Sequence, residues 1–252
     1  MSFEVAAEAY DQFMGRWSSA LAPQLAQFAG VRPGSKVLDV GCGPGALTGE
    51  LVARLGPSAV SAVDPSVSFV TAARQRNPGV DVRQAAAEQL PFPDGMFDAA
   101  LAQLVVHFMA DPVAGLAEMA RVTRSPGTVA ACVWDYAGEN GPLGPFWPAA
   151  RSLDPEVKDE SLLPGAREGH LEQLFREAGL GGVVQDAFSV SQDLSDFEEW
   201  WQPFTKRVGP AGAYVASLSV DQRAELRERC RSMLPPGPFT ITARAWGARG
   251  VT

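Results

Sequence analysis

The sequence predicts an α/β fold in which a mostly parallel sheet is covered by helices on both of its faces. Two observations support this prediction: short apolar runs alternate with longer segments of helical periodicity, and a glycine-rich turn follows the first apolar run. The chain has 252 residues, of which 46% are hydrophobic, so a single domain with insertions can bury a full core.

The first predicted unit is a short buried strand at 36–40, a tight turn and a helix at 46–55. The later apolar runs, each bounded by turn residues, predict further strands at 59–63, 80–83, 97–103, 127–134, 183–191 and 239–246. Helical periodicity predicts the remaining helices at 17–28, 66–76, 112–122, 170–177, 196–207 and 220–233.

Two long connections, at 135–169 and 192–238, do not fit this alternation and are rich in aromatic residues. Long connections beyond sheet strands are common places for lids, so we expect both insertions to form an α-helical cap on the substrate side. Their aromatic side chains either line the acceptor pocket or only pack the cap onto the sheet. These residues are Tyr136, Phe146, Trp147, Phe197, Trp200, Trp201, Phe204 and Tyr214.

The turn after the first strand is the most informative motif. Glycines at 41, 43 and 45 allow backbone conformations that are closed to residues with a Cβ, and they let a ligand approach the main chain. A dinucleotide site would use Gly41, Gly43 and Ala46, with Asp64 as the acidic residue about 20 positions on. Asp39 argues against that site, because a carboxylate there repels a pyrophosphate and attracts a cationic amino acid group.

Four motifs in register resemble those of the class I S-adenosylmethionine-dependent methyltransferases. They are D-x-G-x-G-x-G at 39–45, the strand end at 62–66, and the A-E-x-L-P-F segment running to F-D at 87–98. The fourth motif is formed by Glu118, Arg121, Val122, Pro126 and Gly127, which resemble the family's E-x-x-R-V-x-x-P-G run. The resemblance covers 37–134 and is strongest to the small-molecule branch that includes the ubiquinone and menaquinone biosynthesis enzymes. It implies a Rossmann-like sheet of seven strands, in which the last strand, within 239–249, is inserted antiparallel.

The resemblance also implies the cofactor, S-adenosylmethionine, and a role for each matching residue. Asp64 would accept the ribose hydroxyls or, alternatively, cap the next helix; Asp39 would hold the amino group or only order the loop. Glu88 would lie beside the adenine or point to solvent. The implied cofactor-binding residues are Tyr10, Met14, Arg16, Asp39, Gly41, Cys42, Gly43, Gly45, Asp64, Pro65, Ala87, Glu88, Gln103 and Leu104.

Residues 10–17 resemble a segment that precedes the sheet in one branch of these enzymes. We therefore expect residues 1–30 to form a helical lid ahead of the cofactor-binding half at 31–134, all within one domain that spans 1–252. In this lid Arg16 would pair with the cofactor carboxylate and Tyr10 would face the sulfonium. The alternative is an amphipathic helix with a solvated Arg16.

His107 follows the fourth strand near the expected reacting centre. A phenol or enol acceptor benefits from a base, and His107 is the candidate by position and by pKa class. It could instead orient a loop or contact the cofactor. No metal is expected, because His107 and His170 are the only histidines and no carboxylate cluster accompanies them. The three cysteines are too widely spaced for a disulfide framework or a zinc site.

Composition narrows the function further. The net charge of −8 argues against nucleic acid as a partner, and the most apolar run, 99–110, is too short to span a membrane. The acidic N-terminus does not resemble a secretory signal, so we expect a cytoplasmic enzyme. The predicted activity is methyl transfer to a small, aromatic or apolar acceptor. The alternatives are a cofactor-binding protein without transfer activity and a nicotinamide-dependent oxidoreductase.

Overall fold

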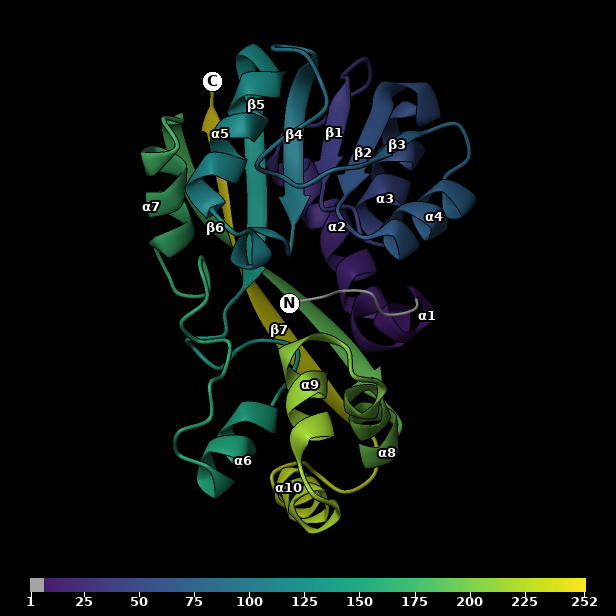
Figure 1. Ribbon diagram of the computed structural model, residues 1–252, viewed down its shortest axis with the longest axis vertical. Coiled ribbons are helices and arrows are strands. Elements are labelled where there is room, and N and C mark those ends of the chain that lie inside the picture. Colours follow the sequence, from purple (N-terminus) through teal and green to yellow (C-terminus); the bar gives the residue numbers. More distant parts are fainter. Residues whose placement is uncertain (1–6) are drawn as a thin grey trace.

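The computed structural model describes residues 7–252, so residues 1–6 of the predicted lid lie outside the described residues. Seven strands form one sheet in the order β3-β2-β1-β4-β5-β7-β6 (Figure 1). They are β1 (Val37–Val40), β2 (Val60–Asp64), β3 (Asp81–Gln84), β4 (Phe97–Gln103), β5 (Thr123–Trp134), β6 (Gly181–Leu194) and β7 (Phe239–Val251). The last strand lies antiparallel between β5 and β6, which confirms the predicted α/β, Rossmann-like topology.

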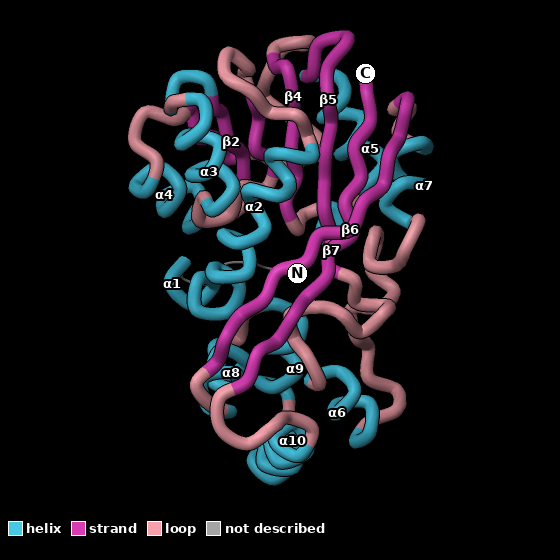
Figure 2. The backbone as a smooth tube through the Cα atoms, turned by 180° about the vertical axis from the view of Figure 1, so that it is seen from behind, coloured by secondary structure: helices cyan, strands magenta, loops and turns pink. Residues whose placement is uncertain are grey.

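Helices cover both faces of the sheet because successive side chains of its central strands point to opposite cores. Leu101 of β4 packs with α2 on one face, and Ala100 packs with α5 on the other. Figure 2 shows α2 over the face that is turned away in Figure 1. The first face carries α2 (Arg16–Phe28), α3 (Ala46–Leu55) and α4 (Val67–Arg76), and the second carries α5 (Pro112–Val122) and α7 (His170–Glu177).

The N-terminal segment is one continuous helical stretch with a change of pitch. A short α1 (Ala7–Tyr10) leads into a π-helical turn, η1 (Asp11–Gly15), and then into α2. π-Helical turns are rare and are often found at functional sites. Since α2 packs across β4, β5 and β6, this turn is held at the edge of the sheet where the parallel strands end.

The cap lies at the outer end of a long hairpin that β6 and β7 form. Pairing between β5 and β7 stops at Trp134 and Ala245, but pairing between β6 and β7 continues to Leu194 and Phe239 (Figure 2). The hairpin thus reaches past the rest of the sheet to the cap helices. These are α6 (Phe146–Leu153), α8 (Phe197–Trp201), α9 (Gly209–Ser217) and α10 (Val220–Ser232).

The cap differs in detail from the prediction. The single helix expected at 196–207 is α8 followed by a 3₁₀ turn, η4 (Gln202–Lys206), because Pro203 has no N–H to continue the α-helical bonding. Helices α6 and α9 lie in stretches rich in glycine and proline and were not predicted. Aromatic rings hold the cap together, and the closest pair is Phe146 stacked on Phe204 at 4.6 Å between ring centroids.

Short 3₁₀ turns complete the described chain, at η2 (Pro57–Ala59) and η3 (Val106–Phe108). No helix within residues 7–252 is long and apolar enough to cross a membrane.

Candidate functional site

A cavity of about 430 Å³ opens at the carboxyl ends of β1, β2 and β4. In open α/β sheets, ligands bind at this edge, beside the point where the strand order reverses. Most of the residues predicted from the sequence meet here, although they come from separate parts of the chain. The predicted residues that line it are Tyr10, Gly41, Gly43, Asp64, Pro65, Ala87, Glu88, Gln103, Leu104 and His107.

The glycine turn is tied to the neighbouring strand. The N–H groups of Gly41 and Cys42 both donate to the Val63 carbonyl, at 2.8 and 2.9 Å. A Cβ on Gly41 would lie 2.4 Å from a methyl group of Val105, so only glycine fits there, and its φ of +70° favours glycine as well. Gly45 is the N-cap of α3 and lines an adjacent open groove rather than the cavity.

Asp64 at the end of β2 is buried and connects two loops. One carboxylate oxygen accepts from the Gly43 N–H at 2.9 Å and the other from the Ser66 N–H at 2.8 Å. Burial raises the pKa of this carboxyl, and these two bonds oppose the rise. The cap of α4 is Ser66, whose hydroxyl accepts from the Phe69 N–H. Ser66 therefore caps this helix, and the alternative in which Asp64 caps it is wrong.

Asp39 is 1% exposed and has one oxygen engaged and one free. Its Oδ2 accepts from the Thr48 hydroxyl at 2.6 Å, whereas Oδ1 has no hydrogen-bond partner among the described residues. Burial, with a contribution from Asp64, raises the pKa of Asp39 to about 7. Thr48 was not predicted, although a hydroxyl residue in the first turn of the helix after Gly45 could have indicated it.

Gln103 offers a second unpartnered acceptor oxygen. Its amide nitrogen donates to the Ser18 carbonyl of α2 at 3.0 Å, and only the nitrogen of an amide can make that bond. The amide oxygen therefore faces away from Ser18, and within the described chain it is buried and unpartnered. Asp39 and Gln103 line the same small cavity, which shares Tyr10, Gly41 and Gly43 with the larger one. Two unpartnered acceptors suit a group that only donates, such as an ammonium.

The loop after β4 lines another part of the main cavity. Leu104 has a φ of +61°, uncommon for a residue with a side chain, and this turns the chain sharply around the cavity. Glu88 accepts from the N–H groups of Ala110 and Asp111 at 2.8 and 3.2 Å. Glu88 therefore holds this loop in place, a role that neither sequence alternative included.

His107 lies in the same loop and is 4% exposed. Burial lowers the pKa of its imidazole to about 3, and its Nδ1 has no partner within residues 7–252. The ring is therefore neutral at physiological pH. Cys42 is also buried, and burial raises the pKa of its thiol well above the usual value, so it remains a protonated loop residue.

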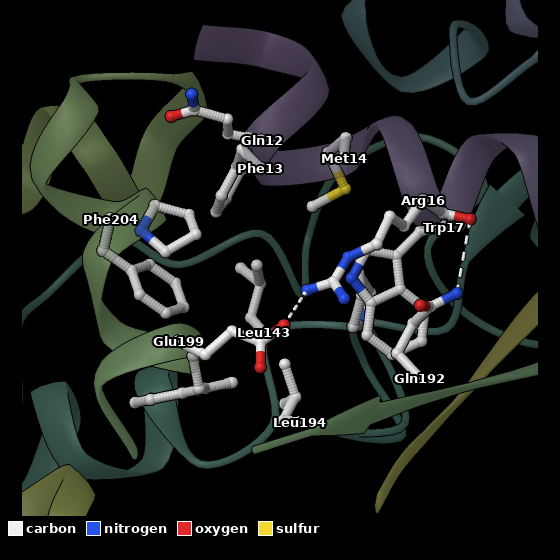
Figure 3. Close-up of a pocket in the computed structure, with 13 residues that line it drawn as sticks. Gln12, Phe13, Met14, Arg16, Trp17, Leu143, Gln192, Leu194, Glu199 and Phe204 are labelled. Carbon is white, nitrogen blue, oxygen red and sulfur yellow. Dashed lines mark hydrogen bonds and ion pairs between the residues drawn. The ribbon is translucent and has the colours of Figure 1, made fainter. Parts of the chain in front are cut away.

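Arg16 and Met14 lie outside the main cavity. Both line a much smaller pocket between the N-terminal helical stretch and the cap (Figure 3). The Arg16 guanidinium donates to Glu199 of α8 at 2.7 Å, and the Gln192 amide donates to the Arg16 carbonyl at 3.3 Å. The pairing of Arg16 with a cofactor carboxylate stays a prediction. In this structure Arg16 links the N-terminal segment to the cap.

Comparisons with known proteins agree with this geometry. The model of a methyltransferase domain family matches residues 38–131. A demethylmenaquinone methyltransferase of a Mycobacterium species is 45% identical over 105 residues, which are 41% of this chain and 43% of that protein. An uncharacterised protein in a transposon of Streptomyces fradiae is 31% identical over 220 residues, or 82% of this chain. The chain spans 60% of the length of the Streptomyces protein.

A solved structure has the same fold at low sequence identity. The phosphoethanolamine N-methyltransferase 2 of Haemonchus contortus, in complex with S-adenosylhomocysteine, superposes with a TM-score of 0.58 at 15% identity. The match covers 98% of this chain and 57% of that protein. Residues 38–131 therefore match a methyltransferase domain, and the chain has the fold of methyltransferases of known structure.

Proposed function

We propose that the protein binds S-adenosylmethionine in the cavity at the sheet edge and transfers its methyl group to a small, apolar or aromatic acceptor. The observation that carries this proposal is the acidic character of the cavity. Asp64 and Glu88 line it, Asp39 lies beside it, and none of the described residues that line it is Arg or Lys. Such a cavity suits a cationic cofactor and disfavours the pyrophosphate of a dinucleotide.

The residues present fit this cofactor group by group. Asp64 would accept the ribose hydroxyls, and the free oxygens of Asp39 and Gln103 would accept from the ammonium. The slot at Ala85, Ala86 and Ala87 would take the adenine. When bound, S-adenosylmethionine supplies a methyl group activated by a sulfonium, and the protein's task is to orient the acceptor and exclude water.

The acceptor side is apolar. The cap buries the rings of Phe146, Trp147 and Phe204, and Tyr136 joins them from the end of β5. Pockets for small molecules are mostly apolar with few polar groups, which supports an aromatic or aliphatic acceptor. Together with the net charge of −8, this supports a small molecule rather than a nucleic acid. We assign His107 a neutral contact at this end, because its low pKa makes it a weak base.

Calorimetry followed by turnover tests the proposal. S-adenosylhomocysteine should bind and NAD should not; the reverse result would support the nicotinamide alternative. A panel of phenols, amines and enols, incubated with S-adenosylmethionine carrying a labelled methyl group, should then yield a labelled product. Cofactor binding without transfer to any member of the panel would favour a binding protein without transfer activity.

A further inference from the structure

The cap contains a buried carboxyl that the cofactor site does not use. Glu160, in the connection between α6 and α7, is 3% exposed. Its Oε2 accepts from the Trp147 indole N–H at 2.9 Å, and the Tyr136 hydroxyl lies close enough to the same carboxyl to lower its pKa. Two neutral donors are a poor match for a buried carboxylate, which normally requires a cation.

The charged groups around Glu160 do not provide that cation. The neighbouring Asp159 is acidic, and Arg151 is already engaged by Asp159 and Glu139. No Lys, Arg or His in the part of the chain that the structure describes forms an ion pair with Glu160. Unpaired buried carboxyls of this kind are expensive and are concentrated at functional sites.

Tyr136 connects this carboxyl to the edge of the sheet where the cofactor cavity lies. It follows the end of β5 by two residues, next to the loop after β4. Its ring lies 6.1 Å from that of His107, which lines the cavity. On its other side Tyr136 lines a small pocket together with Trp147 of the cap. Tyr136 therefore stands between the cofactor cavity and the cap.

We propose that Glu160, acting through the Tyr136 hydroxyl, takes up the proton that the acceptor loses on methylation. The proposal rests on the function proposed above. As the acceptor atom forms its bond to the methyl carbon, the carbon–sulfur bond breaks and its electron pair stays on sulfur. The acceptor proton moves to the Tyr136 oxygen while the hydroxyl proton of Tyr136 moves to Glu160. The products are the methylated acceptor, S-adenosylhomocysteine and neutral Glu160, which then returns the proton to solvent.

The protonation equilibria of the neighbouring groups suit these roles. Burial raises the pKa of Glu160 to about 7, with the Trp147 hydrogen bond and the nearby Tyr136 hydroxyl opposing the rise and Asp159 adding to it. A base whose pKa is near the working pH is present in its active form and still takes a proton readily. Burial and Glu160 raise the pKa of Tyr136 well above its usual value, so this hydroxyl passes a proton on without ionising.

An infrared titration tests whether Glu160 lies near the reacting centre, and it requires no acceptor. The difference between the wild-type and Glu160→Gln spectra isolates the carboxyl band, which should titrate near pH 7 in the free protein. S-adenosylmethionine places a positive charge near the reacting centre and S-adenosylhomocysteine does not. The titration midpoint should therefore be about one pH unit lower with S-adenosylmethionine than with S-adenosylhomocysteine. Equal midpoints with both ligands bound would overturn the inference.

Rates against pH complete the test with an acceptor identified by the panel. Glu160→Gln and Tyr136→Phe should each lower the rate by about 100-fold and abolish its rise through neutral pH, with unchanged affinity for S-adenosylhomocysteine. Tyr214→Phe is the matched control, since Tyr214 also packs on Trp147 but does not contact Glu160. A wild-type pH profile in Glu160→Gln would overturn the relay. Failure of the wild type to bind either ligand would overturn the proposed function and the relay with it.

Discussion

Replacing Asp39 by asparagine should stabilise the free protein at alkaline pH and weaken cofactor binding. Burial raises the pKa of this carboxyl from 3.8 to about 7. The folded state therefore holds the proton more tightly, so its contribution to stability is complete below pH 3.8 and is lost as the pH rises through 7. The loss amounts to about 4 kcal/mol of unfolding free energy above pH 7, as an order of magnitude.

Asparagine avoids this loss because it is neutral at every pH, and its carbonyl still accepts from the Thr48 hydroxyl. Urea unfolding at about pH 5 and about pH 8.5 measures the effect. The Asp39→Asn variant should exceed the wild type by up to about 4 kcal/mol at the higher pH and by much less at the lower one. Its affinity for S-adenosylhomocysteine should fall at least about tenfold, because a charged partner of the ammonium is lost. Methylthioadenosine, which lacks the amino-acid portion and its ammonium, should bind as before.

Asp135 is the matched control because it is equally buried and has the opposite shift. Burial raises its pKa, but hydrogen bonds from Asn140 and Arg244 outweigh burial and hold the pKa below the usual value. Its ionised form stabilises the fold, so Asp135→Asn should lower stability at both pH values. If Asp39→Asn also proved less stable than the wild type at the higher pH, the reasoning about the unpartnered oxygen would be refuted.

Three other predictions concern the cofactor and the N-terminal segment. Asp64→Ala should weaken S-adenosylhomocysteine and methylthioadenosine equally, by at least about tenfold in calorimetry, because both contain the ribose; unchanged affinities would remove Asp64 from the site. At a hundred times its Kd, S-adenosylhomocysteine should add about 2.7 kcal/mol and raise the melting temperature by roughly 5–10 °C, whereas NAD should leave it unchanged. Arg16→Ala breaks a solvent-exposed pair with Glu199 and should lower stability by less than about 1 kcal/mol. A greater loss of affinity for S-adenosylhomocysteine than for methylthioadenosine in that variant would place Arg16 on the cofactor carboxylate.

Features determined by local sequence were predictable. The strand ending at Asp39, the glycine turn and the helix after it follow from short-range periodicity and from backbone sterics. The cavity then follows from topology, because parallel strands bring Asp39, Asp64 and Gln103 to the same edge. This part of the chain is also where the family motifs lie.

Features that depend on distant contacts were not predictable. Arg16 meets Glu199 across most of the chain, and no local pattern in either segment indicates the pair. Glu160 lies in the first of the two insertions, where no local pattern marks it as buried, yet tertiary packing places it against Trp147. The length of β6 was underestimated for a related reason, since β6 is an edge strand that pairs only with β7 and its periodicity is weak.

The hairpin of β6 and β7 has a consequence for how such an enzyme can diversify. Residues 195–238 leave the sheet after Leu194 and return at Phe239, and these two residues are paired. Paired residues of antiparallel strands are only about 5 Å apart, so the whole segment enters the chain at a single junction. A different segment could replace it there without shifting any strand, because loop-closure entropy depends only weakly on length. Under the function proposed above, exchange at this junction would alter the choice of acceptor and leave the methyl donor the same.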